Sequence, residues 1–308
     1  MKIAISTSSF DLKNNPVLDE LRAIGAQIVT NPYQRKLDPA ETVKFLENVV
    51  GLIAGVEILD STVLSQCPDL RVISRCGAGL DNIDETFASA SGIDVRSTPD
   101  APTTAVAELT LGLILSSLRH IAITDREIRN GVWKQRYGRL LGERTVGIIG
   151  YGRIGKNVAH LLRGFGCEIL VYDNIPHLEL GSDQVSLETL IKKSDVVCLH
   201  VPLTSETRGL ISSREFSYFK SDAVIVNTSR GEIIDEKALQ IALNKGQIGF
   251  AALDTFEREP YAGPLIDNDN VLLTAHMGSY AIEARRRMEI CAMRNLVDAL
   301  EITGDVKR

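Results

Sequence analysis

The sequence predicts an α/β protein with two doubly wound parallel sheets. Short apolar segments alternate with helical patterns along most of the 308 residues, and such alternation requires crossover connections between parallel strands. Two separate series of this kind occur, one before and one after Trp133. A chain of this length is sufficient for about two domains at roughly 100–200 residues each.

The first series predicts a small sheet with helices between its strands. Its short apolar segments are residues 2–6, 27–30, 51–54 and 71–74. Helical patterns occupy residues 16–24 and 40–48.

The second series predicts a complete nucleotide-binding sheet. Its first segment, TVGIIG at 145–150, is apolar on both faces, as buried parallel strands are, and a helix over 153–165 follows. The further strand segments are residues 168–172, 196–199, 223–227, 249–254 and 271–273. The last helical pattern, 281–301, lies beyond this series, and the pattern alone allows it to join either domain. Trp133 is expected to anchor packing before the second domain.

Composition excludes several classes of protein. The formal net charge is -6 without a dense basic block, so nucleic acid is not an expected partner. The most apolar stretch, 105–124, is interrupted by Glu108, Arg119 and His120, which predicts a buried helix and no membrane span. The five cysteines are scattered without a C-x-x-C pair. We therefore expect no disulfide framework and no metal site, and a cytoplasmic protein without a signal peptide.

A glycine-rich motif predicts a dinucleotide site. Gly150, Gly152 and Gly155 form G-x-G-x-x-G between an apolar strand and a helix. In this context the first glycine permits the tight turn, the second lets backbone approach a pyrophosphate, and the third allows close helix–strand packing. Asp173 ends the next strand segment, where a carboxylate accepts hydrogen bonds from ribose hydroxyls and repels a 2′-phosphate. The expected cofactor is NAD.

Three polar residues at strand ends of the second series are candidates for chemistry. Hydride transfer to a keto acid requires a cation for its carboxylate and carbonyl, and an acid for the developing alkoxide. Arg230, Glu259 and His276 each follow a strand segment, and ligands of open α/β sheets bind beyond the carboxyl ends of the strands.

The chain resembles the D-isomer-specific 2-hydroxyacid dehydrogenases, and within them the phosphoglycerate dehydrogenase group in a short form without the regulatory domain. Seven ordered motifs carry the resemblance: RCGAGLDNID (75–84), TAVAELTLGLIL (104–115), LLGERTVGIIGYGRIGK (140–156), HVPLTSETRGLI (200–211), NTSRGEIIDEKAL (227–239), ALDTFEREP (252–260) and TAHMGS (274–279). The resemblance implies a Rossmann NAD-binding domain of residues 98–280. It also implies a discontinuous, flavodoxin-like substrate domain of residues 1–97 and 281–308.

The resemblance also implies a role for each catalytic candidate. Arg230 would bind the substrate carboxylate and carbonyl through its rigid fork. His276, in a motif where Ala275 replaces the family's proline, would be the general acid for reduction and the base for oxidation. Glu259 would hydrogen-bond His276, fix its tautomer and favour its protonated form.

Further residues receive ligand-binding roles from the same resemblance. Backbone N–H groups of Cys76, Gly77 and Ala78 would bind the substrate carboxylate. Besides the glycine motif, Asp173 and His276, the cofactor would be lined by Arg153, Ile154, Val201, Pro202, Thr228, Ser229, Asp254 and Gly278. The family also implies a homodimer.

The resemblance makes 3-phosphoglycerate the first expectation for the substrate. Glyoxylate or hydroxypyruvate and D-lactate remain alternatives, because residues 52–57 lack the arginines that some phosphoglycerate dehydrogenases carry there. The alternative from another class is an NAD-sensing scaffold similar to the C-terminal-binding corepressors.

Overall fold

The protein divides into two compact units in a computed structural model that describes residues 1–7, 9–23 and 25–303. Unit 1 comprises Met1–Pro102 with Tyr280–Arg308, and unit 2 comprises Thr103–Ser279. The sequence analysis placed the divisions after residues 97 and 280. Residue 24 of the first expected helix and residues 304–308 of the expected substrate domain lie outside the described residues.

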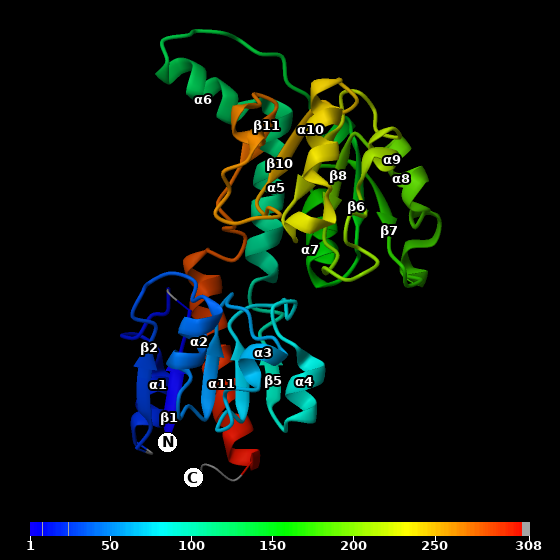
Figure 1. Ribbon diagram of the computed structural model, residues 1–308. Coiled ribbons are helices and arrows are strands. Elements are labelled where there is room, and N and C mark those ends of the chain that lie inside the picture. The colour runs from blue at the N-terminus through cyan, green and yellow to red at the C-terminus, as the bar shows by residue number, and fades with distance from the viewer. Residues whose placement is uncertain (8, 24, 304–308) are drawn as a thin grey trace. The chain divides into compact units, whose positions relative to one another are not determined.

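Unit 1 contains a five-stranded parallel sheet in the order β2-β1-β3-β4-β5 (Figure 1). Its strands are β1 Lys2–Ile5, β2 Gln27–Thr30, β3 Gly51–Ala54, β4 Val72–Arg75 and β5 Asp94–Ser97. This order is that of the flavodoxin-like doubly wound fold. The sequence analysis missed β5, because this edge strand is only half-buried and carries Asp94 and Arg96.

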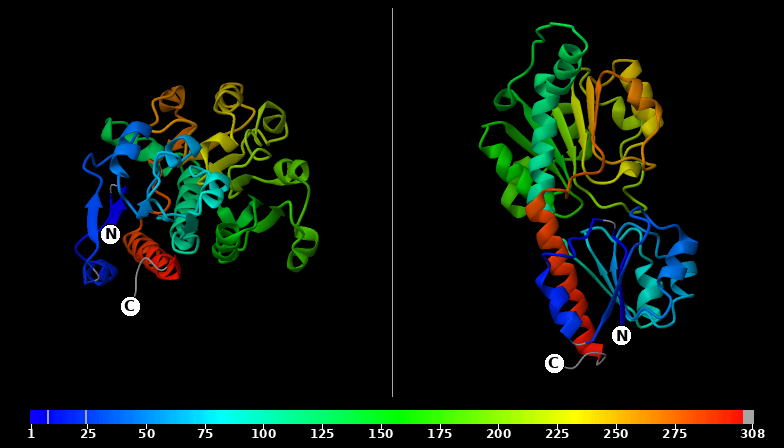
Figure 2. Two further views of the ribbon diagram at one scale, coloured as in Figure 1. Left: turned by 60° about the horizontal axis from the view of Figure 1, so that its bottom comes forward. Right: turned by 90° about the vertical axis from the view of Figure 1, so that its left-hand side faces the viewer.

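Helices cover both faces of the unit 1 sheet. One face packs against α1 (Pro16–Ala23) and α11 (Ile282–Thr303), which lie side by side in Figure 2. The other face packs against the short helices α2 (Pro39–Phe45), α3 (Ser61–Leu64) and α4 (Glu85–Ala90). Because α11 contacts β3, β4 and β5, the end of the chain returns to the first unit.

Unit 2 contains a six-stranded parallel sheet in the order β11-β10-β9-β8-β6-β7. Its strands are β6 Thr145–Ile149, β7 Glu168–Tyr172, β8 Val196–Leu199, β9 Val224–Asn227, β10 Phe250–Leu253 and β11 Val271–Leu273. β7 is the edge strand of this sheet, and on its free side an isolated parallel bridge joins Val171 to Gln184. This bridge occupies the position of the third Rossmann strand. The prediction of two parallel-sheet α/β domains is confirmed.

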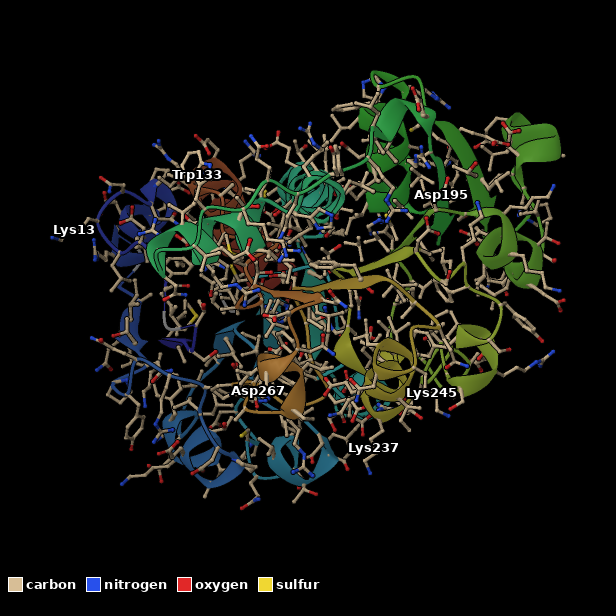
Figure 3. All side chains as sticks on the ribbon, turned by 90° about the horizontal axis from the view of Figure 1, so that it is seen from above. Lys13, Trp133, Asp195, Lys237, Lys245 and Asp267 are labelled. Atoms are coloured by element: carbon tan, nitrogen blue, oxygen red, sulfur yellow. The ribbon has the colours of Figure 1, made fainter. Side chains whose placement is uncertain are left out.

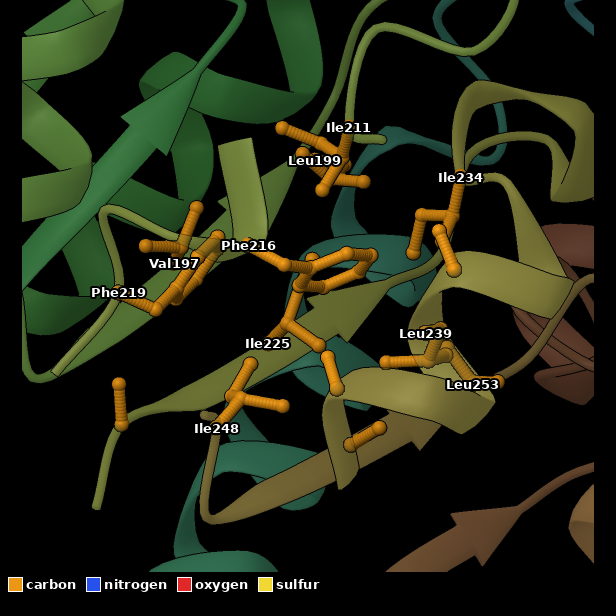
Figure 4. Close-up of a cluster of buried hydrophobic side chains, with 14 of the residues drawn as sticks. Val197, Leu199, Ile211, Phe216, Phe219, Ile225, Ile234, Leu239, Ile248 and Leu253 are labelled. Atoms are coloured by element: carbon orange, nitrogen blue, oxygen red, sulfur yellow. The ribbon is translucent and has the colours of Figure 1, made fainter. Parts of the chain in front are cut away.

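Two layers of helices enclose the unit 2 sheet. Helices α5 (Thr103–Arg119) and α7 (Arg153–Arg163) cover one face. The other face packs against α8 (Leu187–Lys193), α9 (Ser213–Phe216) and α10 (Glu236–Asn244). Figure 4 shows Phe216 of α9 among the aliphatic side chains of this second layer. Short 3-10 turns lie at Leu141–Glu143, Leu178–Asp183, Gly231–Ile233 and Pro264–Asp267.

The single helix expected over 105–124 is two helices. α5 ends at Arg119 because His120 adopts a left-handed backbone with φ 55°, and α6 (Ile121–Arg129) follows at a bend of 63°. Among the described helices none alone is long and apolar enough to span a membrane, although the bent pair of α5 and α6 reaches that length and composition. The α5 part is a buried helix of unit 2, as expected.

An extended arm, residues 130–140, begins at the far end of α6 and runs back toward the sheet (Figure 1). Trp133, labelled in Figure 3, is 84% exposed, and Tyr137 is fully exposed. The expectation that Trp133 anchors packing is therefore wrong for this chain alone. The arm is held by an ion pair of 2.7 Å between Arg136 and Glu127 of α6.

Candidate active site

All the candidate cofactor and catalytic residues of unit 2 follow the carboxyl ends of its strands. Gly150 follows β6, Asp173 follows β7, and Val201 and Pro202 lie just beyond β8. The remaining strand ends carry Thr228, Ser229 and Arg230 after β9, Asp254 after β10 and His276 after β11. Since every strand of this sheet is parallel, these residues gather at one edge, where the strand order reverses between β6 and β8.

Each of the three motif positions favours glycine for a different structural reason. Gly150 has φ +94°, and a Cβ there would lie 2.7 Å from the carbonyl group of His200. A Cβ on Gly155 would lie 2.0 Å from the Gly150 oxygen, so close packing of α7 excludes any side chain. A Cβ on Gly152 would meet no atom within 4 Å among the described residues.

The N-terminus of α7 fits a pyrophosphate. Gly152 is its N-cap residue, and none of the described side chains caps this end of the helix. The first N–H groups of a helix and its dipole favour an anion. The open space over Gly152 gives backbone access to that anion, so this loop fits a dinucleotide on structural grounds.

Asp173 is held in an ionised, oriented state at the end of β7. Its carboxylate accepts hydrogen bonds from the N–H groups of Tyr151 at 2.6 Å and Ile175 at 3.1 Å. Burial raises the pKa of Asp173, but these N–H donors and the nearby His177 outweigh it, and the pKa lies below its usual value. The sequence analysis missed the supporting role of His177, whose Nε2 lies 3.5 Å from the carboxylate.

The loop after β9 is shaped by the buried side chain of Asn227. Asn227 accepts hydrogen bonds from Ser229 N–H and Oγ, and its amide donates to the Arg230 carbonyl at 2.7 Å. Thr228 lies within hydrogen-bond distance of Thr110 on α5, at 2.9 Å between the two hydroxyls. A Cβ on Gly231 would overlap the backbone of Phe256, so the loops after β9 and β10 lie in direct contact.

His276 and Glu259 form a hydrogen-bonded pair, with 2.8 Å between Nδ1 and Oε2. Burial raises the pKa of Glu259, but the hydrogen bond and charge of His276, the Phe256 N–H and the charge of Arg230 together hold the pKa below its usual value. The three catalytic candidates therefore share one electrostatic environment. Because Glu259 contacts Nδ1, Nε2 is the ring nitrogen that does not take part in this pair.

A buried aspartate fixes the loop that carries His276. The backbone of His276 is left-handed, with φ 49°, a conformation that costs a residue with a Cβ about 1–2 kcal/mol. Its N–H donates to the Asp254 carbonyl at 2.8 Å. The Asp254 carboxylate accepts from Thr274 Oγ1, Met277 N–H and Gly278 N–H at 2.6, 2.9 and 2.8 Å. Asp254 thus supports His276, a contribution that sequence reasoning missed.

The candidate substrate loop lies in unit 1, after β4. Two of its three N–H groups are used within the unit, since Cys76 donates to the Ala54 carbonyl and Gly77 donates to Thr98 Oγ1. Ala78 is exposed. The hydrogen bond from Gly77 to Thr98 could not be found from the motif, because Thr98 follows β5, the strand that the sequence analysis missed.

The described residues contain no group of three or more His, Cys, Asp or Glu side chains placed to hold a metal ion. The five cysteines are free. Burial raises the pKa of the Cys76 thiol to about 11, so this thiol in the substrate loop is neutral at pH 7.

Known proteins resemble this chain over most of its length. Residues 111–278 match the family model for the D-isomer specific 2-hydroxyacid dehydrogenase, NAD binding domain. A glyoxylate reductase of Pyrococcus furiosus is 39% identical over 271 residues, 83% of this chain and 80% of that protein. A hydroxypyruvate reductase of Thermotoga maritima is 38% identical, over 86% of this chain and 90% of that protein. A crystal structure of a glyoxylate reductase from Paecilomyes thermophila superimposes with a TM-score of 0.87 at 30% identity, covering 97% of this chain and 95% of that one.

The glycine loop generates a matched pair of variants. Gly152→Ala should keep the thermal midpoint within about 2 °C, because its Cβ meets open space, and should weaken NADH binding by occupying that space. Gly155→Ala should lower the midpoint, because its Cβ overlaps the Gly150 carbonyl. Thermal unfolding and NADH fluorescence titration measure the two effects. Equal loss of stability in both variants would contradict this assignment of the glycines.

Proposed function

Since this chain belongs to the D-isomer specific 2-hydroxyacid dehydrogenase family, an NAD-dependent oxidoreductase family, we propose that it reduces glyoxylate or hydroxypyruvate. The observation that carries the proposal is the His276–Glu259 pair, 2.8 Å apart. The pair lies at the same sheet edge as the glycine loop. A proton donor and a dinucleotide site at one edge are what reduction of a carbonyl requires.

The cofactor is NAD, and we propose which residues hold it. The N-terminus of α7, with Gly150, Gly152, Arg153, Ile154 and Gly155, would receive the pyrophosphate. Asp173 would accept hydrogen bonds from the adenosine ribose. The loops that carry Val201, Pro202, Thr228, Ser229, Asp254, His276 and Gly278 would line the rest of the site. When bound, the reduced cofactor supplies the hydride.

Arg230 and His276 would act on the substrate itself. The guanidinium fork of Arg230 binds the carboxylate and carbonyl oxygens and polarises the carbonyl carbon. As the carbonyl oxygen gains negative charge, His276 donates its Nε2 proton to it. Glu259 accepts the Nδ1 hydrogen bond throughout and holds the imidazole ring in this orientation. One proton from the imidazolium and one hydride then complete the 2-hydroxy acid.

The loop of unit 1 would bind the substrate carboxylate. Cys76 and Gly77 shape the loop through hydrogen bonds within the unit, and the exposed Ala78 presents the N–H group that we assign to the carboxylate. A backbone N–H binds an anion without adding a side chain, which suits a substrate as small as glyoxylate.

Two observations favour an unphosphorylated substrate over the 3-phosphoglycerate expected at first. The relatives described above are named glyoxylate and hydroxypyruvate reductases. In addition, residues 52–57 contain no arginine but end in the buried Glu57, whose carboxylate accepts from Gly55 N–H at 3.1 Å. A phosphate site requires cations, and a buried carboxylate opposes one. The names of these relatives also favour an enzyme over the scaffold alternative.

We also propose that two copies of the chain associate through α6 and the arm. Trp133 and Tyr137 are exposed there together with Ile128, Val132 and Leu140. Exposed apolar groups gathered in this way mark a protein–protein interface. The cytoplasm, whose reducing conditions suit five free cysteines, is the proposed compartment.

A screen of NADH oxidation tests the substrate. We expect kcat/KM for glyoxylate or hydroxypyruvate to exceed that for 3-phosphohydroxypyruvate at least about tenfold, a difference of about 1.4 kcal/mol in transition-state binding. Pyruvate tests the D-lactate alternative in the same assay. A preference for 3-phosphohydroxypyruvate would overturn the substrate proposal, and turnover of none of these acids would overturn the proposed function.

Substitution of the imidazole tests the proton donor. His276→Ala should lower kcat about 10²–10⁴-fold, the usual contribution of a positioned acid, while the Kd for NADH stays within about threefold. His160→Ala, which removes an exposed histidine of α7, is the control and should keep full activity. A loss of less than about threefold in His276→Ala would rule out the assigned role.

Charged substitutions in the arm test association. The double variant Trp133→Asp/Tyr137→Asp should convert a dimer to a monomer, because burial of two carboxylates at an interface is unfavourable. Size-exclusion chromatography with light scattering measures the mass. Ile241→Asp, at an exposed apolar position on α10, is the control and should leave the mass unchanged. A wild-type monomer, or a double variant that remains dimeric, would contradict the proposal.

A further inference from the structure

We propose that His177 sets how strongly the protein prefers NAD to NADP. Its ring lies beside Asp173, the carboxylate that we assign to the adenosine ribose, so the charge on the ring decides how strongly a 2′-phosphate is repelled. The inference rests on the proposed placement of NAD in unit 2. It goes further by assigning a pH-dependent choice of cofactor to a residue outside the glycine motif.

The imidazole of His177 lies between two carboxylates. Its Nε2 is 3.5 Å from Asp173, at the end of β7, and its Nδ1 is 3.6 Å from Glu179 in the following 3-10 turn. The side chain of His177 is 14% exposed and that of Asp173 is 12% exposed. Because both groups lie largely out of bulk water, a charge on the ring acts on Asp173 more strongly than an exposed charge would.

Local contacts hold the ring in this place. The His177 N–H donates to Gln184 Oε1 at 2.8 Å, and the Gln184 amide donates to the Ile175 carbonyl at 2.7 Å. The imidazole packs edge to face with Tyr151 of the glycine loop, with 5.2 Å between the ring centroids. Tyr151 N–H in turn donates to the Asp173 carboxylate at 2.6 Å. The imidazole, the carboxylate and the glycine loop are therefore fixed relative to one another.

The charge of Lys156 on α7 is directed to the other carboxylate. Its Nζ lies 3.3 Å from Glu179 and 5.4 Å from the ring centroid of Tyr151, and the side chain is half exposed. Lys156 thus pairs with Glu179, whereas the imidazole of His177 is in contact with Asp173. The charge that Asp173 meets at this contact depends on the protonation of His177.

Protonation of the ring changes what a 2′-phosphate meets. Histidine is the side chain whose charge ordinarily changes between pH 5 and 8. Beside a neutral ring, the carboxylate of Asp173 keeps its full negative charge and opposes a 2′-phosphate. An imidazolium compensates that charge and has a donor on each ring nitrogen. As the pH falls, NADPH should therefore be repelled less, whereas NADH, which has no 2′-phosphate, should be affected much less.

Fluorescence titrations with NADH and NADPH at several pH values test the inference. The ratio of the Kd for NADPH to the Kd for NADH should fall at least about fivefold from pH 8 to pH 6, the low end of ordinary coupling between two binding events, here of a proton and a phosphate. In His177→Asn, which carries no charge, the ratio should stay high over this range. In His177→Lys, which is charged throughout, the ratio should stay low.

His160→Asn is the matched control, because it removes an exposed histidine of α7. Its ratio should follow that of the wild type. The 2′-phosphate of NADPH also titrates near this range, but it does so equally with all four proteins, so the difference between wild type and His177→Asn reports the imidazole alone.

The outcomes separate this inference from the proposed function. A wild-type protein that does not bind NADH overturns both. Binding of NADH with a ratio that is constant from pH 8 to pH 6 overturns the inference alone. An equal fall in wild type and His177→Asn, or a ratio in His177→Lys as high as that of the wild type at pH 8, also overturns it. If thermal unfolding shows that His177→Asn does not fold, His177→Gln takes its place under the same criterion, and the wild-type and His177→Lys ratios still decide.

Discussion

The site depends on the buried carboxylate of Asp254. It accepts three hydrogen bonds from the segment after β11 and thereby stabilises the left-handed backbone of His276, which would otherwise be unfavourable. With that backbone in place, Nδ1 reaches Glu259 at 2.8 Å. The position of the imidazole is therefore set by backbone geometry as well as by its partner, which suits the directed proton donor that we propose.

A parallel sheet explains how residues distant in the sequence come to lie at one edge. The segments after β6, β7, β9, β10 and β11 contribute the glycine loop, Asp173, Arg230, Asp254 and His276. All leave the sheet at the same edge, so each loop has a short path to a common ligand. Contacts between loops maintain their spacing. For example, Gly231 lies so close to the backbone of Phe256 that a Cβ on Gly231 would overlap it. Unit 1 has the same arrangement on a smaller scale, with the candidate substrate loop at the carboxyl end of β4.

The sequence predicted the structural features that depend on local patterns and on motifs. Continuous apolar segments indicated the buried strands, and the motif around Gly150 indicated the turn before α7. The polar edge strand β5 has no such pattern, since its pairing with β4 decides its structure. The left-handed backbone of His120, which ends α5, is not indicated by any local pattern either. Asp254 was expected to line the cofactor, but its support of His276 depends on backbone N–H groups that no residue type reveals. Trp133 was misjudged because an aromatic side chain suits an interface as well as a core.

The most direct test of the whole account is a crystal structure of the protein with NADH and oxamate, a carboxylate that resembles glyoxylate and is not reduced. The account predicts that His276 Nε2 and the Arg230 guanidinium both lie about 3 Å from the amide carbonyl oxygen of oxamate. It also predicts that the nicotinamide lies over the adjacent carbon and that the pair of His276 with Glu259 is retained. An imidazole directed away from the ligand in such a fully occupied complex would contradict the central claim.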